Sequence, residues 1–261
     1  MKKIKIKKLK ISIITVSRNS QETIRDTIES VLGQTYQDVE YIIIDGNSND
    51  NTMSIINEYS DRCAHIIHEV DLGIYDAMNK GIALCTGDII GILNSDDIFN
   101  KSNTLSEIHE EFIKSNAESI YGDLVYVSVQ DTNEVVRVWK AGKYNNMSFK
   151  YGWMPPHPTF FVKKGNYANY GNFRAGFKIS ADYELMLRLL YKYKISTSYL
   201  PIVLTRMRIG GISNLSLKNR LKAQNEDKLA WTINGLTPGY FTILLKPLRK
   251  VLQFFYKLYK K

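Results

Sequence analysis

Residues 11–127 alternate short apolar runs, rich in β-branched side chains, with segments whose apolar residues recur at helical spacing. The apolar runs are Ile11–Val16, Tyr41–Ile44, His65–Glu69, Ile89–Leu93 and Ile120–Val127. The helical segments between them carry their first apolar residues at Ile24, Met53, Ile74 and Leu105. Strands that alternate with helices in this way form βαβ units and a parallel sheet. The pattern therefore predicts an α/β fold with a mostly parallel central sheet flanked by helices.

The pattern is less regular beyond residue 130. Predicted strands cover Val135–Trp139, Thr159–Val162 and Tyr199–Met207, and predicted helices cover 180–193 and 215–233. Ser180 stands at the start of one helix, and Asn19 with Glu22 has the form of a capping box before the helix that contains Ile24. No internal repeat or low-complexity linker divides the chain. We expect one domain over residues 1–239, with a regular half at about 11–130, a mixed half at about 131–239, and a tail at 240–261.

Acidic residues follow the predicted strands. Asp45 ends the second apolar run, Asp71 precedes the helix at Ile74, and Asp96 with Asp97 follows Ile89–Leu93. Ligands bind beyond the carboxyl ends of strands in such sheets, so we expect these acids to share one edge. Adjacent carboxylates suit Mg²⁺ or Mn²⁺, which nucleotide enzymes hold with one or two carboxylates plus substrate phosphates. The alternatives are structural: Asp45 as part of a turn, and the acid pair as a helix-start signal.

Charge and cysteine content narrow the function classes. The net charge is +9, but residues 1–10 carry six lysines and residues 246–261 carry six basic residues, which leaves −3 for the rest. Basicity at the two ends does not predict a nucleic-acid groove. Cys63 and Cys85 form neither a disulfide framework nor a metal motif, which favours a cytoplasmic setting. The apolar stretch near the N-terminus is shorter than the about 7–15 residues of a signal-peptide core, and no stretch reaches the roughly 20 residues of a membrane span.

The tail, residues 240–261, has a pattern of its own. Apolar residues from Phe241 to Leu258 recur at helical spacing, lysines and Arg249 fill the positions between them, and Pro247 can start a helix. A basic amphipathic helix is typical of an interfacial membrane anchor. The alternative is a C-terminal helix packed on the body. The anchor predicts peripheral attachment to an anionic membrane, on the inner face of the plasma membrane.

The strand-end motifs of the chain resemble those of glycosyltransferase family 2. Members of this family have the GT-A fold, a Rossmann-like nucleotide-diphospho-sugar transferase fold. The resemblance extends over about residues 11–215. It is carried by Thr15-Val-Ser-Arg-Asn19, Ile44-Asp-Gly-Asn-Ser-Asn-Asp50, Asp71–Gly81, Leu93-Asn-Ser-Asp-Asp97, Ser180–Arg188 and Gly210-Gly-Ile-Ser213. Within the family, the chain is similar to the bacterial branch that builds exopolysaccharide, capsule or O-antigen.

The resemblance implies roles for the matched residues at the nucleotide. The end of the first strand around Thr15, together with Asp45, would hold the base and ribose. Asp71 would line the nucleotide pocket. Asp96 would meet the ribose or the donor sugar, and Asp97 would ligate Mn²⁺ or Mg²⁺.

The resemblance also implies roles on the acceptor side. Asp182 would be the general base that deprotonates the acceptor hydroxyl, and the Gly210–Gly211 segment would lie near the diphosphate. Alternatively, Asp182 would have only a structural role in the first turn of its helix, where a negative charge is favourable. Glu184 is a rival base, but two residues further along a helix it should point elsewhere.

Two positions depart from the common family pattern. Asn94 stands where many members carry the first acid of the acidic motif, so metal binding would depend on Asp97 and the phosphates. Met78 stands where many members have Arg. Lys80 would supply the missing cation, although a helix turns about 200° over two residues.

Several further residues are candidates with structural alternatives. Tyr75 and Asp76 would touch the donor sugar, or Tyr75 would pack its helix. His157, within Pro155-Pro-His-Pro158, would complete the metal shell or touch the acceptor, or would be a packed loop residue. Arg206 and Arg208 would steady the diphosphate, or would be surface residues.

Together these features predict an inverting, metal-assisted hexosyltransferase. It would move a sugar from a nucleotide diphosphate, with UDP as the expected carrier, to a growing glycan linked to a polyprenyl diphosphate. A nucleotidyltransferase is one alternative, but it would normally have a glycine-rich phosphate loop where this chain has Ser17-Arg-Asn-Ser20. A catalytically silent nucleotide-sugar-binding scaffold is the other, and it would be indifferent to Asp182→Ala.

Overall fold

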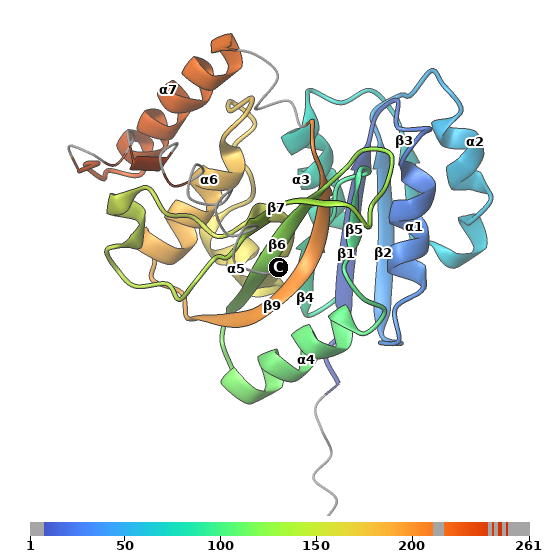
Figure 1. Cartoon of the computed structure of the whole chain (residues 1–261), viewed down its shortest axis with the longest axis horizontal. Helices are drawn as coiled ribbons and strands as arrows, with labels where there is room; N and C mark the ends of the chain where they lie inside the picture. Colours follow the sequence, from blue (N-terminus) through green and yellow to red (C-terminus); the bar gives the residue numbers. More distant parts are fainter. Residues whose placement is uncertain (1–7, 211–216, 240–241, 243–244, 247–248, 250–261) are drawn as a thin grey trace, which may run out of the picture.

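The computed structural model describes residues 8–210 and 217–239, together with residues 242, 245, 246 and 249. Figure 1 shows a central sheet with helices packed around it. In its first half the elements are β1 (Ile11–Ser17), α1 (Ile24–Leu32), β2 (Val39–Asp45), α2 (Thr52–Asn57), β3 (His65–His68), α3 (Ile74–Leu84), β4 (Ile89–Ile92), β5 (Asp97–Phe99), α4 (Thr104–Ser115) and β6 (Ser119–Val127). Then follow β7 (Val135–Trp139), β8 (Phe161–Lys163), α5 (Lys164–Tyr170), α6 (Ala181–Met186), which continues as a π-helix over Leu187–Lys192, β9 (Thr197–Arg208) and α7 (Leu217–Ile233).

The strands form one mixed sheet in the order β3-β2-β1-β4-β8-β6-β9-β5, with β7 added beside β6. The strands β1, β2, β3 and β4 pair in parallel, as do β6 and β9. The strands β5, β7 and β8 pair with their neighbours in antiparallel fashion. The predicted α/β class, with a mostly parallel sheet and a mixed second half, is confirmed.

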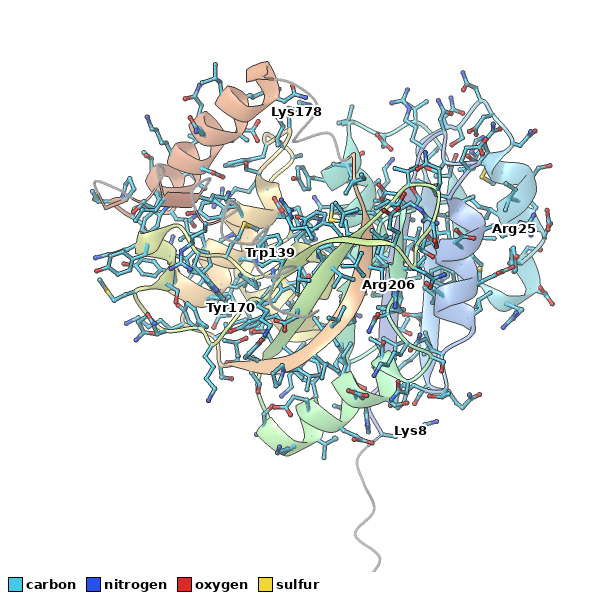
Figure 2. The ribbon with its side chains drawn as sticks, viewed as in Figure 1. Lys8, Arg25, Trp139, Tyr170, Lys178 and Arg206 are labelled. Carbon is cyan, nitrogen blue, oxygen red and sulfur yellow. The ribbon has the colours of Figure 1, made fainter. Side chains whose placement is uncertain are left out.

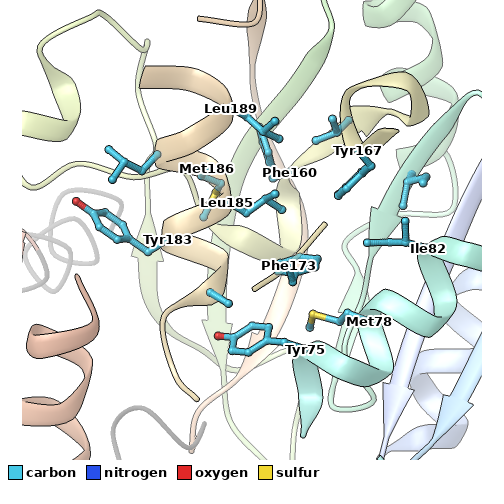
Figure 3. Close-up of a cluster of buried hydrophobic side chains, with 14 of the residues drawn as sticks. Tyr75, Met78, Ile82, Phe160, Tyr167, Phe173, Tyr183, Leu185, Met186 and Leu189 are labelled. Carbon is cyan, nitrogen blue, oxygen red and sulfur yellow. The ribbon is translucent and has the colours of Figure 1, made fainter. Parts of the chain in front are cut away.

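Alternating side chains of β1 enter two separate apolar clusters, one on each face of the sheet. Ile11 and Ile13 pack with helices α1, α2 and α4, whereas Ile14 and Val16 pack with α3, α5, α6 and α7. Figure 3 shows the second cluster, in which Phe173 lies between Met78 of α3 and Leu185 of α6. Burial on both faces explains why the central strands are continuously apolar.

Local details differ from the sequence-based expectations in several places. The prediction of a capping box at Asn19 and Glu22 is wrong. Helix α1 begins at Ile24 with Thr23 before it, and Asn19 has a left-handed φ of 51°. Ser180 does precede α6, but its hydroxyl donates to the carbonyl of Ala223 (3.3 Å) and does not cap the helix. The short elements β5 and α5 were not predicted.

Within the described residues, no helix is both long enough and apolar enough to span a bilayer.

Candidate active site

Three polar side chains lie in one row across β1, β2 and β3 at their carboxyl ends. The parallel register sets Ser17 beside Asp45, and Asp45 beside His68. Ser17 Oγ donates to Asp45 Oδ1 (2.8 Å), and His68 Nδ1 lies 2.7 Å from Asp45 Oδ2. Ser48 adds hydrogen bonds from its backbone N–H (2.8 Å) and hydroxyl (2.6 Å). Burial opposes ionisation of Asp45, but these hydrogen bonds outweigh it and lower its pKa.

The loop after β1 is fastened to the loop after β2. The Asn19 N–H donates to Ser48 Oγ (2.8 Å), and Asn19 Oδ1 accepts from the N–H of Asn49 (3.0 Å). The left-handed backbone of Asn19, a residue that tolerates this conformation, allows both contacts. Asp45 therefore sits beneath a preformed pair of loops at the edge of the sheet.

Asp71 comes from the next strand-to-helix connection and lies against Gly46. A Cβ added to Gly46 would stand 2.2 Å from Asp71 Oδ2, so glycine permits this close approach. Asp71 Oδ1 accepts from the N–H of Gly73 (2.8 Å), just before α3. The structure thus brings together Asp45 and Asp71, as the edge rule predicts.

Lys80 of α3 is engaged by acids of the same region. Its Nζ lies 2.8 Å from Glu69 Oε1 and 3.5 Å from Asp76 Oδ2, and it donates to the carbonyl of Val70 (3.1 Å). Asp76 also accepts from the N–H of Leu72 (3.1 Å). In this arrangement Lys80 orders the loop that carries Asp71.

Two of the predicted residues point into the protein. Thr15 is fully buried, and its hydroxyl accepts from Tyr41 (3.0 Å). Met78 is also buried, in the cluster of Figure 3. Thr15 therefore lies below the end of β1, where Ser17 is the last residue.

Asp96 is half-buried at the end of the β4–β5 connection and is held through its main chain. Arg208 Nη1 donates to the Asp96 carbonyl (2.9 Å), and Arg208 Nη2 pairs with Asp26 at the start of α1. Burial raises the pKa of Asp96, although a backbone hydrogen bond and the positive charge of Arg208 partly oppose this. Arg208 itself is only 5% exposed, so it is a positioning residue for the acidic loop in this conformation.

The side chain of Asp97 is buried inside the protein. It is 0% exposed and belongs to β5, where it pairs with Met207, and its carbonyl accepts from Thr27 Oγ1 (2.8 Å). Among the described residues, neither of its carboxylate oxygens has a hydrogen-bond partner, and the same holds for Asn94 Oδ1. Burial and the neighbouring charge of Asp96 raise the pKa of Asp97 well above its usual value.

The carboxylate oxygens of Asp97 and the amide oxygen of Asn94 are possible ligands for a divalent cation. Buried oxygens without donors are the hard ligands that Mg²⁺ and Mn²⁺ take. In the part of the chain that the structure describes, however, no three His, Cys, Asp or Glu side chains gather as a metal cage. The residues therefore fit a cation that one or two carboxylates share with substrate phosphates, and not one held by the protein alone.

Asp182 lies at the first turn of α6, close to groups from two other segments. Its Oδ2 is 3.4 Å from His157 Nδ1, and its Oδ1 is 3.4 Å from the hydroxyl of Tyr75. The side chain of Asp182 is 21% exposed, so a substrate can reach it. The structure therefore brings together Asp182, His157 and Tyr75, which come from three separate segments of the chain.

Glu184, the rival base, faces away from this place. It is 0% exposed and accepts from Arg188 Nε (2.9 Å), Arg174 Nε (3.0 Å) and Asn234 Nδ2 (2.9 Å). Arg206, labelled in Figure 2, is tied to Asn100 Oδ1 (2.9 Å) and to the carbonyl of Thr132 (2.8 Å). Both residues therefore serve the scaffold. The Gly211–Ser213 part of the predicted diphosphate loop lies outside the described residues.

Sequence reasoning did not identify the contribution of His68. The parallel register of β2 and β3 is what sets it beside Asp45, and no local motif signals that pairing. The link between Arg208 and Asp26 was also missed, because it joins residues 182 positions apart.

A cavity of about 640 Å³ lies elsewhere, lined by Tyr121, Tyr144, Tyr199 and their neighbours. It adjoins the first residues of β9, whereas the last residue of β9, Arg208, holds Asp96. The cavity is thus at the opposite end of the sheet from the acids, and we assign no substrate to it.

A mixed sheet with loops and acids at the carboxyl ends of its strands is the arrangement expected of a GT-A transferase. A family model for glycosyl transferase family 2 matches residues 12–186. The chain belongs to this family, as its motifs predict.

Comparisons with individual proteins agree with this family assignment. The chain is 29% identical over 209 residues to a PGL/p-HBAD biosynthesis glycosyltransferase of Mycobacterium bovis, covering 78% of each chain. Its fold resembles that of S. aureus TarS in complex with UDP-GlcNAc, with a TM-score of 0.68 at 16% identity over 97% of this chain and 76% of that one. It also resembles the mannosyltransferase PcManGT from Pyrobaculum calidifontis with GDP-Man and Mn²⁺, with a TM-score of 0.64 at 15% identity over 92% and 68%.

At these identities the two solved structures bear on the fold alone, and they confirm the predicted GT-A fold. In another structure, of TarS 1-349 in complex with UDP, this chain covers 65% of the TarS chain.

Proposed function

We propose that the protein transfers a hexosyl group from a nucleotide-diphosphate sugar, with UDP as the nucleotide, to a hydroxyl of a growing cell-surface glycan. Family membership and the nucleotide sugars bound by the fold neighbours support a donor of this kind. The donor would bind to the half formed by residues 11–130, and the acceptor to the half formed by residues 131–239.

The observation that carries the mechanism is that His157 and Tyr75 approach the two carboxylate oxygens of Asp182, whose side chain is 21% exposed. The acceptor oxygen attacks the anomeric carbon of the sugar as Asp182 takes the hydroxyl proton. The bond between that carbon and the diphosphate breaks, and the nucleoside diphosphate leaves with the electron pair. A single in-line displacement of this kind inverts the anomeric configuration. Tyr75 and His157, which lie against the two carboxylate oxygens, orient Asp182 for this step.

The nucleotide end of the donor would lie over the row that contains Asp45. Because the carboxylate of Asp45 already accepts hydrogen bonds from Ser17, Ser48 and His68, it would act by shaping the loops. The half-exposed Asp71 would contact the nucleotide directly, and Thr15 would support the strand from below. Lys80 and Asp76 would keep the Asp71 loop in place.

Asp96 and Asp97 are the groups that would hold Mn²⁺ or Mg²⁺ together with the diphosphate. The cation would neutralise the charge that grows on the leaving diphosphate. Asp96 is half-buried and is the more accessible ligand, whereas the carboxylate of Asp97, the next residue, is fully buried.

The acceptor would be linked to a polyprenyl diphosphate, which would bring the enzyme to the inner face of the plasma membrane. The predicted anchor lies mostly outside the described residues. Those of its residues that the structure describes contact the body: Lys246 Nζ is 2.7 Å from Asp227 Oδ2, and Arg249 Nε donates to the carbonyl of Tyr151 (2.9 Å). We therefore assign membrane contact to the basic residues beyond Arg249.

A thermal-shift panel of UDP, GDP and dTDP sugars, with and without Mn²⁺, tests the donor assignment. A ligand at about 100 times its dissociation constant stabilises the folded state by about 2.7 kcal/mol. We expect a UDP-sugar to raise the melting temperature, and more so with Mn²⁺. A panel in which no nucleotide sugar moves the melt would refute the donor.

Flotation with anionic liposomes tests the anchor. Replacing Lys250, Lys257, Lys260 and Lys261 by serine should reduce binding, because each basic residue near an anionic surface contributes about 1 kcal/mol. Truncation after Gly239 is a poorer test, since it also removes the contacts of Lys246 and Arg249 with the body. Undiminished flotation of the serine variant would reject the anchor.

Family membership favours transfer of a sugar over transfer of a nucleotidyl group, the first alternative. A silent scaffold would bind the nucleotide sugar and release no nucleoside diphosphate when acceptor is added. Measuring the release of nucleoside diphosphate with a membrane fraction as acceptor distinguishes the scaffold from the proposed transferase.

A further inference from the structure

The segment directly before Asp182 is held by a carboxylate from the far end of the chain. Glu226 of α7 is 8% exposed and accepts from the backbone N–H groups of residues 178–180. Its Oε2 is 3.2 Å from the nitrogen of Lys178, 2.8 Å from that of Ile179 and 2.9 Å from that of Ser180. Its Oε1 receives a second contact from the Lys178 nitrogen, at 3.0 Å. Asp182 is the second residue after this segment.

Helix α7 and the residue that follows it contact α6 at two further points. Trp231 Nε1 donates to the hydroxyl of Tyr183 (2.9 Å), and Asn234 Nδ2 donates to Glu184 Oε1 (2.9 Å). Figure 1 shows α7 beside α6, and Figure 2 shows Lys178 at the end of the loop that leads into α6. Helix α7 is therefore packed along α6 and fixes both its start and its first turn.

The same segment is fastened from the opposite side by α3. The hydroxyl of Tyr75 donates to the carbonyl of Ile179 (2.7 Å). Burial raises the pKa of Tyr75 well above its usual value, so this hydroxyl keeps its proton at neutral pH. The N–H and C=O groups of Ile179 are thus both used, one toward α7 and one toward α3.

We propose that Glu226 is a positioning residue for catalysis, which sets the location of Asp182 relative to His157 and the acceptor hydroxyl. The proposal rests on the proposed role of Asp182 as the base. Helix α7 lies beyond residues 12–186, which match the family model, so it supplies from outside that region a contact on which the active site depends.

Loss of the Glu226 carboxylate should have a strong effect on the position of Asp182. Hydrogen bonds from N–H groups to an ionised carboxylate are about twice as strong as those between neutral groups. Removing a buried acceptor leaves its donors unpaired, which costs more than the bond itself contributes. The loop would relax to pair these N–H groups with water, and Asp182 would move with it.

Kinetics of Glu226→Ala and Glu226→Gln test the proposal, with Asp182→Asn measured in parallel. We expect Glu226→Ala to lower kcat on the order of 100-fold, because a displacement near 1 Å in an active site has that effect. Glu226→Gln keeps one acceptor oxygen where Oε2 stands, so it should recover much of the rate. Binding of the donor, measured with UDP-sugar and Mn²⁺, should be unchanged in both variants, since Glu226 contacts none of the proposed donor residues.

Asp227→Ala is the matched control. Asp227 is the next residue of α7, is equally buried, and pairs with Lys246 and not with the loop. It should lower the melting temperature and leave kcat near the wild-type value. If Glu226→Ala and Glu226→Gln both keep wild-type kcat while Asp182→Asn is inactive, Glu226 has no positioning role. The same conclusion follows if Asp227→Ala loses kcat to the same degree as Glu226→Ala. If Asp182→Asn retains transfer, the proposed base is wrong, and the role of Glu226 fails with it.

Discussion

At the scale of single residues, the site depends on how closely two loops approach. Gly46 follows Asp45, and its missing side chain leaves room for the carboxylate of Asp71. The obstructing atom is the end of a side chain and not backbone, so a methyl group at Gly46 would displace Asp71 and leave the fold intact. The positions of the two proposed nucleotide residues are thus coupled through Gly46.

Gly46→Ala should therefore weaken binding of the nucleotide sugar roughly tenfold, which is about 1.4 kcal/mol. The melting temperature of the unliganded protein should change little. Isothermal titration with a UDP-sugar measures the first quantity, and calorimetry measures the second. Gly165→Ala is the control, since a Cβ at Gly165 meets nothing within 4 Å. Equal affinities in the two variants would show that Asp71 does not contact the nucleotide.

At the scale of elements, a buried carboxylate joins three segments at the other end of the strands. Glu40 of β2 accepts from Ser12 Oγ (2.5 Å), from Thr86 N–H (2.7 Å) and from Lys10 Nζ (2.9 Å). Burial opposes ionisation of Glu40, but hydrogen bonds from Ser12, Thr86 and Lys10 outweigh it and lower its pKa to about 2. This carboxylate therefore holds β1, β2 and the segment before β4 together when it is charged.

Because the pKa of Glu40 is lower in the folded state than in the unfolded state, its contribution to stability is complete above the unfolded value of 4.5. It is lost as the pH falls through the folded value of about 2. Glu40→Gln should cost about 2 kcal/mol at pH 7, as expected for hydrogen bonds to a charged group. Urea unfolding at several pH values measures the difference between the two proteins, which should shrink steadily below pH 4.5. A difference that stays constant down to pH 2 would contradict this.

Elements with strong periodicity were predictable from the sequence, and those defined by tertiary contacts were not. The continuous apolar run Ile11–Val16 identifies a buried strand, and β1 extends it by only one residue. By contrast, β5 has three residues and exists because it pairs with β9, far away in the chain. Asn19 failed as a cap because its side chain pairs with the neighbouring loop, a contact that local sequence does not encode.

At the scale of the whole molecule, the fold assembles the site from distant segments. The edge rule for parallel sheets predicted that Asp45, Asp71 and Asp96 would follow strand ends, and they do. It does not say which of two adjacent acids faces outward. Asp97 joins β5 and is fully buried, whereas Asp96 stays half-buried at the end of the β4–β5 connection. Nor does it reveal that Glu226, 44 positions after Asp182, holds the loop before the proposed base.

The most direct test of the proposed chemistry is sugar transfer by Asp182→Asn at saturating UDP-sugar and Mn²⁺. The amide keeps the shape of the side chain but cannot accept the acceptor proton. We expect kcat to fall about 100- to 10,000-fold, the usual contribution of a general base, with the dissociation constant of the donor unchanged. Transfer by Asp182→Asn at the wild-type rate would contradict the assignment of Asp182 as the base.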